Sequence, residues 1–281
     1  MGAHNDIKLS QCKMIIAEYK LKVMAILETK LDQQATARAA RLINPSWSFL
    51  HNLDQAPYGR ILILYDPCLF TLSIITSSPQ FIHCHAVSTS TNLSFYLTFV
   101  YAFNSVNARK SLMHSIPFLR QNSHPWLILG DFNCCFELNQ RLGRNALSNN
   151  EIKPLKSCLI NSELITFKKT GMQHTWNNKR ISSSRTYSSI DHAFCNQNAL
   201  DFWPAISLHS PPPLLSDHSP IILSLSSVAM INNKSFKFFN AWIGEPDFQD
   251  EVRKIWHTPF FGNPLVILQR KLGALKAHLK L

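Results

Sequence analysis

The chain has 281 residues, and 46% of them are hydrophobic. This content excludes disorder over most of the length and suffices for one large domain with an appendage or for two small domains. The 28 Lys and Arg residues exceed the 17 Asp and Glu, and the net charge of +11 favours an anionic partner such as nucleic acid or a membrane surface, although a merely basic soluble protein is the alternative.

The N-terminal half of the chain alternates between helical and strand-like patterns. Apolar residues at helical spacing predict a helix over residues 6–20, and an apolar run of strand length follows and ends on Glu28. Residues 32–42 are predicted as a loop or a short helix. Four strand-like runs then come close together and favour a meander. These runs cover residues 60–67, 69–78, 81–89 and 94–104.

The next part of the chain mixes helices and strands again. The pattern predicts a helix over 107–121, a strand over 126–130 and a helix over 149–164, followed by short strands and loops over 171–228. Strands interspersed with helices indicate an α/β layered sandwich. The character changes after about residue 232, because the chain then becomes helical. We therefore expect one domain over residues 1–230, and a linker with a helical extension over 231–281.

The N-terminus and the cysteines indicate the cellular compartment of the protein. The N-terminus lacks the apolar core of a secretory signal peptide, and no run of about 18 apolar residues occurs that could span a membrane. The seven cysteines are odd in number and show no Cys-x-x-Cys spacing, which argues against a disulfide framework or a zinc finger. We expect a nuclear or cytoplasmic protein that is not secreted, with no membrane contact and no small-molecule cofactor.

Polar side chains stand at the ends of several apolar runs. In WLILGDFNCCF, residues 126–136, a buried-looking run stops on a carboxylate and an amide, and an ordinary strand-ending turn is the alternative explanation. Taken together, such strand ends would place several carboxylates, two amides, a phenol and an imidazole in one cleft. The residues concerned are Glu28, Tyr101, Asn104, Asp131, Asn133, Asp191, Asp217 and His218.

This combination of side chains suits metal-assisted cleavage of a phosphodiester. Magnesium binds few protein carboxylates and completes its shell with water and phosphate oxygens. The metal stabilises the charge that builds up on the leaving oxygen, while a carboxylate orients or deprotonates the attacking water. An imidazolium or amide donor holds the non-bridging oxygens. The sequence therefore predicts Mg²⁺ as cofactor, with Mn²⁺ as an alternative.

Four short motifs, in this order, resemble the endonuclease/exonuclease/phosphatase family, which includes abasic-site endonucleases, deoxyribonuclease I, inositol phosphatases and sphingomyelinases. The motifs are ETK (28–30), GDFN (130–133), SxIDH (188–192) and SDHSP (216–220). The resemblance spans about residues 5–226. It implies a four-layer α/β/β/α sandwich of the DNase I-like type and a hydrolase acting on phosphate esters.

Longer stretches are similar to the endonuclease region and following linker of plant-type LINE retrotransposon proteins. They are SFYLTFVYAFNS (94–105), PWLILGDFN (125–133), TWNN (175–178) and the aromatic segment that begins at FKFFNAW (236–242). In those proteins a reverse transcriptase comes next, and this chain stops about where it would begin. The resemblance thus implies a DNA endonuclease that nicks a target strand and leaves a 3′-hydroxyl primer.

The family resemblance also implies roles at the metal and the attacking water. Glu28 corresponds to the metal-binding glutamate, and Asp217 to a second carboxylate near the metal. Asp131 corresponds to the aspartate that positions or activates the water, and Asn133 to an amide that contacts the phosphate. These four residues would form the hydrolytic half of the site.

Further positions correspond to family residues that contact phosphate or DNA. His218 would bind the scissile phosphate, with Asp191 as the carboxylate that orients it. Tyr101 and Asn104 would contact phosphate or DNA. The TWNN stretch at 175–178 corresponds to a motif with either a structural role or a role at the DNA edge, and both readings stay open.

The chain departs from the family pattern in two places. It begins MGAHNDIK, beyond the family's Trp-Asn-x-Arg-Gly stretch, so we expect the first strand and its asparagine to be missing. Small residues, Ser188 and Ser189, stand where a basic residue often precedes the Ile-Asp pair, with Arg185 a few positions earlier. Three possibilities follow: a LINE-type DNA endonuclease impaired by the missing strand, an inactive retroelement remnant that only binds nucleic acid, or a phosphatase of the same fold.

Overall fold

The structure is a computed structural model that describes residues 6–55, 60–143, 146–181, 184–225, 247–262 and 264–278. The chain divides into two compact units, Met1–Ser227 and Val228–Leu281. The expected domain boundary near residue 230 falls within 226–246, outside the described residues.

The first outer layer of the larger unit is helical and consists of α1 (Asp6–Glu18) and α2 (Gln33–Ile43). Asp32 begins α2 as its N-cap, because its Oδ1 accepts a hydrogen bond from the Ala35 N–H at 2.8 Å. Residues 32–42, predicted as a loop or a short helix, therefore form a helix. The apolar faces of α1 and α2 pack on the sheet beneath them through Leu9, Cys12, Ile16, Ala39, Ala40 and Ile43.

The second layer contains an antiparallel sheet with the strand order β1 (Val23–Leu27), β3 (Ile61–Tyr65), β2 (Ser48–His51). The run ILILY in β3 is buried on both of its faces. Leu62 and Leu64 contact the helices of the first layer, and Ile61 and Ile63 face the next sheet. An unbroken apolar run is what a strand covered on both sides requires.

The third layer is a six-stranded sheet. Its order is β4 (Phe70–Ser78), β5 (Phe81–Ser88), β6 (Ser94–Tyr101), β7 (Trp126–Asp131), β13 (Asp191–Cys195), β9 (Ile165–Thr166). Strands β4 to β6 form the predicted meander, but the run at 60–67 does not join it and instead forms β3 in the other sheet. β4 exposes much of one face, whereas β3 is apolar on both faces and suits the interior.

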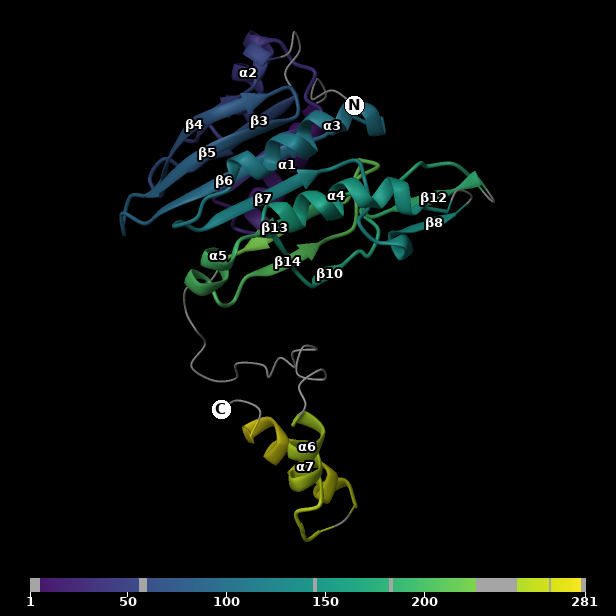
Figure 1. The fold of residues 1–281 in the computed structure, drawn as a ribbon. Helices are drawn as coiled ribbons and strands as arrows, with labels where there is room; N and C mark the ends of the chain where they lie inside the picture. The colour runs from purple at the N-terminus through teal and green to yellow at the C-terminus, as the bar shows by residue number, and fades with distance from the viewer. Residues whose placement is uncertain are drawn as a thin grey trace. The chain divides into compact units, whose positions relative to one another are not determined.

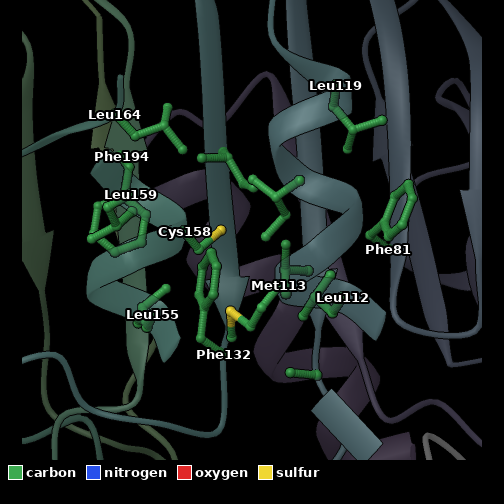
Figure 2. Close-up of a cluster of buried hydrophobic side chains, with 14 of the residues drawn as sticks. Phe81, Leu112, Met113, Leu119, Phe132, Leu155, Cys158, Leu159, Leu164 and Phe194 are labelled. Carbon is green, nitrogen blue, oxygen red and sulfur yellow. The ribbon is translucent and has the colours of Figure 1, made fainter. Parts of the chain in front are cut away.

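The fourth layer covers the opposite face of this sheet with α3 (Val106–Ser115) and α4 (Asn149–Asn161), as Figure 1 shows. Figure 2 shows the buried side chains at their contact with the sheet, among them Met113, Leu155, Phe132 and Phe194. The helix predicted over 107–121 ends earlier, because Pro117 has no N–H to donate and the chain continues as the 3-10 turn η2 (Ile116–Leu119). The four layers confirm the predicted α/β/β/α sandwich.

Smaller elements complete the described part of the chain. Two further three-stranded sheets have the orders β11-β12-β8 and β10-β14-β15. Their strands and the remaining short helices are β8 (Arg141–Gly143), β10 (Lys169–Gly171), β11 (Trp176–Asn177), β12 (Thr186–Ser188), β14 (Ser207–Ser210), β15 (Ile222–Ser224), α5 (Gln197–Phe202), η1 (Leu53–Gln55) and η3 (Leu138–Gln140).

The second unit contains two helices, α6 (Phe248–Trp256) and α7 (Pro264–His278), within the predicted helical extension. The Lys271 ammonium lies 5.5 Å from the centre of the Trp256 ring and donates a hydrogen bond to the Trp256 carbonyl oxygen, which joins the two helices. Across the described residues of both units, each helix is too short or too polar to cross a membrane.

Candidate active site

Three polar side chains meet at one end of the six-stranded sheet. Tyr101 at the end of β6 pairs with Asp131 at the end of β7, and Asp131 pairs with Asp191 at the start of β13. β6 and β7 approach so closely that a Cβ atom on Gly130 would lie 2.0 Å from the Val100 carbonyl oxygen. Gly130 also has a φ of +141°, a conformation that other residues rarely adopt, so only glycine fits before Asp131.

The GDFN stretch forms a tight turn around a buried carboxylate. Asp131 is 4% exposed, and its Oδ1 accepts a hydrogen bond from the Asn133 backbone N–H at 2.8 Å. Asn133 adopts a positive φ of 49°, and its side-chain Nδ2 donates to the Ala102 carbonyl oxygen at 2.7 Å. The turn that ends β7 therefore also holds the Asp131 carboxylate at the end of the sheet.

The second buried carboxylate, Asp191, forms an ion pair with His218. The imidazole Nδ1 lies 3.2 Å from Asp191 Oδ1 and 3.1 Å from Oδ2. Thr175 positions both partners: its hydroxyl oxygen accepts from the Asp191 N–H at 3.1 Å, and its carbonyl oxygen accepts from the Ser219 N–H at 2.7 Å. The TWNN stretch therefore has a structural role here, because it joins the β13 segment to the loop that carries His218.

Burial and neighbouring charge strongly shift the protonation of this group. Burial disfavours the charged imidazole, but the hydrogen bond to Asp191 and the charges of Asp191, Asp131 and Asp217 outweigh it and raise the pKa of His218 to about 9. Burial raises the pKa of the Asp131 carboxyl well above its usual range, and the Asp191 carboxylate adds to the rise. At neutral pH the site therefore holds a charged imidazolium next to a carboxyl group that resists ionisation.

Two more carboxylates lie on the more open side of the site. Glu28 directly follows β1 with a φ of 56°, its side chain is 38% exposed, and its Oε1 lies 2.8 Å from the Lys30 ammonium. Asp217 is half-buried, and its Oδ2 accepts a hydrogen bond from the Trp176 indole N–H at 3.2 Å. Both carboxylates are reachable from solvent, unlike Asp131.

Tyr101 lies between the two groups of carboxylates. Burial raises the pKa of its phenol to about 12, and the negative charges of Glu28, Asp131 and Asp217 contribute to the rise. Glu28, Asp131 and Asp217 thus lie close enough to Tyr101 for their charges to act on its phenol. The phenol keeps its proton at neutral pH and can donate a hydrogen bond.

Asn104 is placed differently from the other predicted residues. β6 ends at Tyr101, and Asn104 lies in the exposed loop just before Ser105, the N-cap of α3. The loop is held by Arg109, whose Nη1 donates to the Asn104 carbonyl oxygen at 2.6 Å and to the Phe103 carbonyl oxygen at 3.2 Å. The Asn104 side chain forms no hydrogen bond to another site residue within the described ranges.

Neither Lys169 nor Arg60 was predicted to belong to the site. The Lys169 ammonium in β10 lies 2.8 Å from the Ser189 hydroxyl oxygen, so a cation does stand beside the small residues that precede Asp191. Arg60, just before β3, stacks over the rings of Tyr101 and Phe103. Both residues come from strands far from their partners in the chain, so no local motif could identify them.

One group of side chains in the described part of the chain has the spacing of a metal site. Asp131, Asp191 and His218 each offer an atom within 4.8 Å of one another, which is a spacing that metal sites use. However, His218 is hydrogen-bonded to Asp191 and carries a proton, so its charge would repel a metal at that point. Glu28 and Asp217 instead offer accessible carboxylate oxygens, which hard divalent ions prefer.

A comparison with protein families identifies the family of this chain. The sequence model of the Endonuclease/Exonuclease/phosphatase family matches residues 2–218, and the chain belongs to this family. Its members are hydrolases that act as nucleases or phosphatases and generally use divalent metal ions. The family resemblance seen in the four motifs is thereby confirmed. No curated protein sequence matches the chain.

Solved structures share the fold at low sequence identity. The endonuclease domain of TRAS1, a telomere-specific non-LTR retrotransposon, is 12% identical with a TM-score of 0.58, covering 79% of this chain and 93% of that domain. The 3′ phosphatase NExo from Neisseria, bound to a product DNA hairpin, is 14% identical (TM-score 0.53, 78% and 95% coverage). A mannosyl-6-phosphatase of Bacteroides thetaiotaomicron is 13% identical (TM-score 0.53, 79% and 91%). These likenesses establish the DNase I-like fold.

Proposed function

We propose that the chain is a divalent-metal-dependent endonuclease that hydrolyses a phosphodiester bond in DNA, as encoded by LINE-type retroelements of the plant type. The observation that carries this proposal is the ion pair between Asp191 and His218 beside Asp131, at the ends of neighbouring strands. The likeness to the TRAS1 endonuclease domain and the net charge of +11 support DNA as the substrate.

In this proposal the buried half of the site carries out the proton and phosphate chemistry. Asp191 holds the proton on Nδ1 of His218, which leaves Nε2–H to donate to a non-bridging oxygen of the scissile phosphate. Asp131 orients the attacking water and takes its proton. The water oxygen forms a bond to phosphorus as the bond to O3′ breaks. O3′ takes a proton from solvent, and the products are a 3′-hydroxyl and a 5′-phosphate.

The open half of the site would hold the metal. Glu28 and Asp217 are the proposed ligands of Mg²⁺, with Mn²⁺ as an alternative, and the ion would stabilise the charge on the leaving oxygen. Lys30 is exposed and can release Glu28 to the ion. Tyr101 donates a hydrogen bond from its phenol to a phosphate oxygen, while Asn133 and Asn104 contact phosphate or DNA.

A supercoiled-plasmid assay tests the proposal. We expect nicked circles with 3′-hydroxyl ends in Mg²⁺, none in the presence of a chelator, and none from Asp131→Ala, which also controls for a contaminating nuclease. Polymerase extension from the nick identifies the 3′-hydroxyl. Nicking that persists in Asp131→Ala, or plasmid that is bound but never nicked, would refute the proposed activity.

A phosphatase acting on a small phosphorylated substrate is the second candidate, because the Bacteroides mannosyl-6-phosphatase shares the fold to a similar degree. Release of phosphate from a sugar phosphate, measured beside the plasmid assay at equal protein concentration, separates the two. Phosphate release without plasmid nicking would favour this candidate over the endonuclease.

A further inference from the structure

We infer that Arg60 binds a phosphate group of the DNA strand next to the scissile phosphate and so helps to position the substrate. This inference rests on the proposed function and adds a residue that neither the sequence motifs nor the family resemblance identified. It is drawn from the place of the guanidinium, from its unused hydrogen-bond donors and from the charges around it.

The guanidinium of Arg60 is held directly beside the site. Its Cζ lies 4.3 Å from the centre of the Tyr101 ring and 4.7 Å from the centre of the Phe103 ring. The backbone below it is fixed, because the fully buried Asn52 accepts hydrogen bonds from the Arg60 N–H at 3.3 Å and the Ile61 N–H at 3.0 Å. Tyr101 pairs with Asp131 across β6 and β7, so one aromatic ring separates Arg60 from the water-orienting carboxylate.

The ring contacts leave the hydrogen-bond donors of the guanidinium without an acceptor. In the described part of the chain no group accepts a hydrogen bond from this side chain, and its Nε is buried without a partner. The residue as a whole is only partly buried. A phosphate offers paired oxygens that match a guanidinium edge, which carries five N–H donors in one plane.

The surrounding charges point to the same ligand. The other cations near the centre are already engaged: Lys30 with Glu28, His218 with Asp191, and Lys169 with the Ser189 hydroxyl. Arg60 has no ion-pair partner among the residues that the structure describes. A phosphate that enters the site meets the negative charges of Glu28 and Asp217, and Arg60 is placed to offset them.

Neutral backbone substitution in the DNA tests this contact. Binding of a short DNA duplex is measured in the presence of a chelator and without added metal. In a series of such duplexes, each phosphate around a previously mapped nicking position is replaced in turn by a neutral methylphosphonate. For the unchanged protein we expect one flanking position to lower the affinity roughly 10- to 100-fold, as expected for a lost charged hydrogen bond. Arg60→Gln should show a similar loss on unmodified DNA and no further loss at that position.

Four further measurements make the test specific. Arg60→Gln should reduce the slope of log affinity against log salt by about one, as the loss of one phosphate contact predicts. Arg60→Lys keeps the charge without the planar fork and should fall between the two proteins. Arg38→Gln, an exposed arginine on α2, is the matched control and should bind as the unchanged protein does. Thermal unfolding checks that each variant is folded.

The possible outcomes separate the two proposals. If the unchanged protein nicks and binds DNA but Arg60→Gln binds equally well, or stays sensitive to every methylphosphonate, the role of Arg60 is refuted and the endonuclease stands. If the unchanged protein neither nicks nor binds DNA, both proposals fail. The methylphosphonate comparison is made within each folded variant, so a small change in stability does not affect it.

Discussion

The carboxylates of the site form two groups that differ in what holds them. Asp131 and Asp191 are 4% and 7% exposed and lie in paired strands. Asp131 accepts a hydrogen bond from the Asn133 N–H, and Asp191 is held by the Thr175 hydroxyl and His218. Glu28 and Asp217 lie outside the strands, are partly exposed, and contact the side chains of Lys30 and Trp176. The buried group is rigid and suited to placing a water and a proton, whereas the open group can exchange a side-chain partner for a cation.

The two groups also have different energetic consequences. A buried carboxylate next to another negative charge destabilises the folded state whenever both are ionised. An exposed carboxylate with a solvent-accessible cation contributes little in either direction. If this comparison is right, substitutions in the buried group should change activity and stability together, and substitutions in the open group should act mainly through the metal.

The largest effect is expected from Asp131→Asn, which keeps the shape of the side chain and removes its charge. We expect plasmid nicking to fall about 1,000-fold or more, because the proposed base is lost. Stability at neutral pH should rise, by roughly 2–4 °C in the thermal midpoint for about 1 kcal/mol, because folding no longer has to protonate a buried carboxyl group whose pKa is raised. A variant that loses activity and also unfolds earlier would contradict the account of the buried pair.

Gly130→Ala tests how strictly the strands position the buried group. The new Cβ would meet the Val100 carbonyl oxygen at 2.0 Å in a backbone conformation that alanine rarely adopts. We expect a loss of about 3 kcal/mol or more in the free energy of unfolding, measured by urea denaturation. Gly273→Ala in α7, where an added Cβ meets nothing within 4 Å, is the control, and equal effects at the two positions would argue against close contact of β6 and β7.

The pH dependence of stability tests the ion pair. Because the folded pKa of His218 is raised to about 9 from 6.5, the stability that the pair contributes is fully present below pH 6.5 and is lost as the pH rises through about 9. We expect the free energy of unfolding of the unchanged protein to exceed that of His218→Gln by about 2 kcal/mol at pH 6 and to converge with it near pH 10. A constant difference across this range would show that His218 does not titrate in the pair.

The smallest effect is expected in the open group, from Trp176→Phe. An aromatic side chain is kept, but the indole N–H that donates to Asp217 is lost. We expect the Mg²⁺ concentration for half-maximal nicking to rise about 10-fold, with the rate at saturating metal almost unchanged, since such second partners orient metal ligands. Trp256→Phe in the second unit is the control. A fall in the saturating rate without a change in metal dependence would place Trp176 in the buried group.

The fold was predictable where local pattern and burial agree. The alternation of β5 and the apolar run of β7 reflect one buried sheet, and their strand ends follow from turn residues in the sequence. Which strands pair with one another was harder to predict from the sequence. For this reason β3 was predicted to belong to the meander, whereas it lies in the other sheet. Helix ends were missed where a proline changed the hydrogen bonding, as at Pro117.

The site was predictable to the extent that it lies in motifs. Asp131 and His218 stand in short stretches with recognisable neighbours, and their proposed roles stay predictions. Arg60 and Lys169 could not be found in this way, because each reaches the site across sheets or from a separate strand. Their contribution depends on tertiary distances of 2.8 to 4.7 Å that no spacing along the chain encodes.

The GDFN turn bears on the order in which substitutions would accumulate in the gene of this protein once selection for activity ends. Gly130 is required by the approach of β6 to β7, Phe132 fills the core with 0% exposure, and Asn133 holds the Ala102 carbonyl oxygen. These three residues would be retained in any descendant that still needs to fold. Burial disfavours the charge of Asp131. A gene copy that is no longer selected for DNA cleavage should therefore replace this residue first. Among gene copies in which the rest of the turn is intact, the residue at position 131 would then distinguish an active copy from an inactive one.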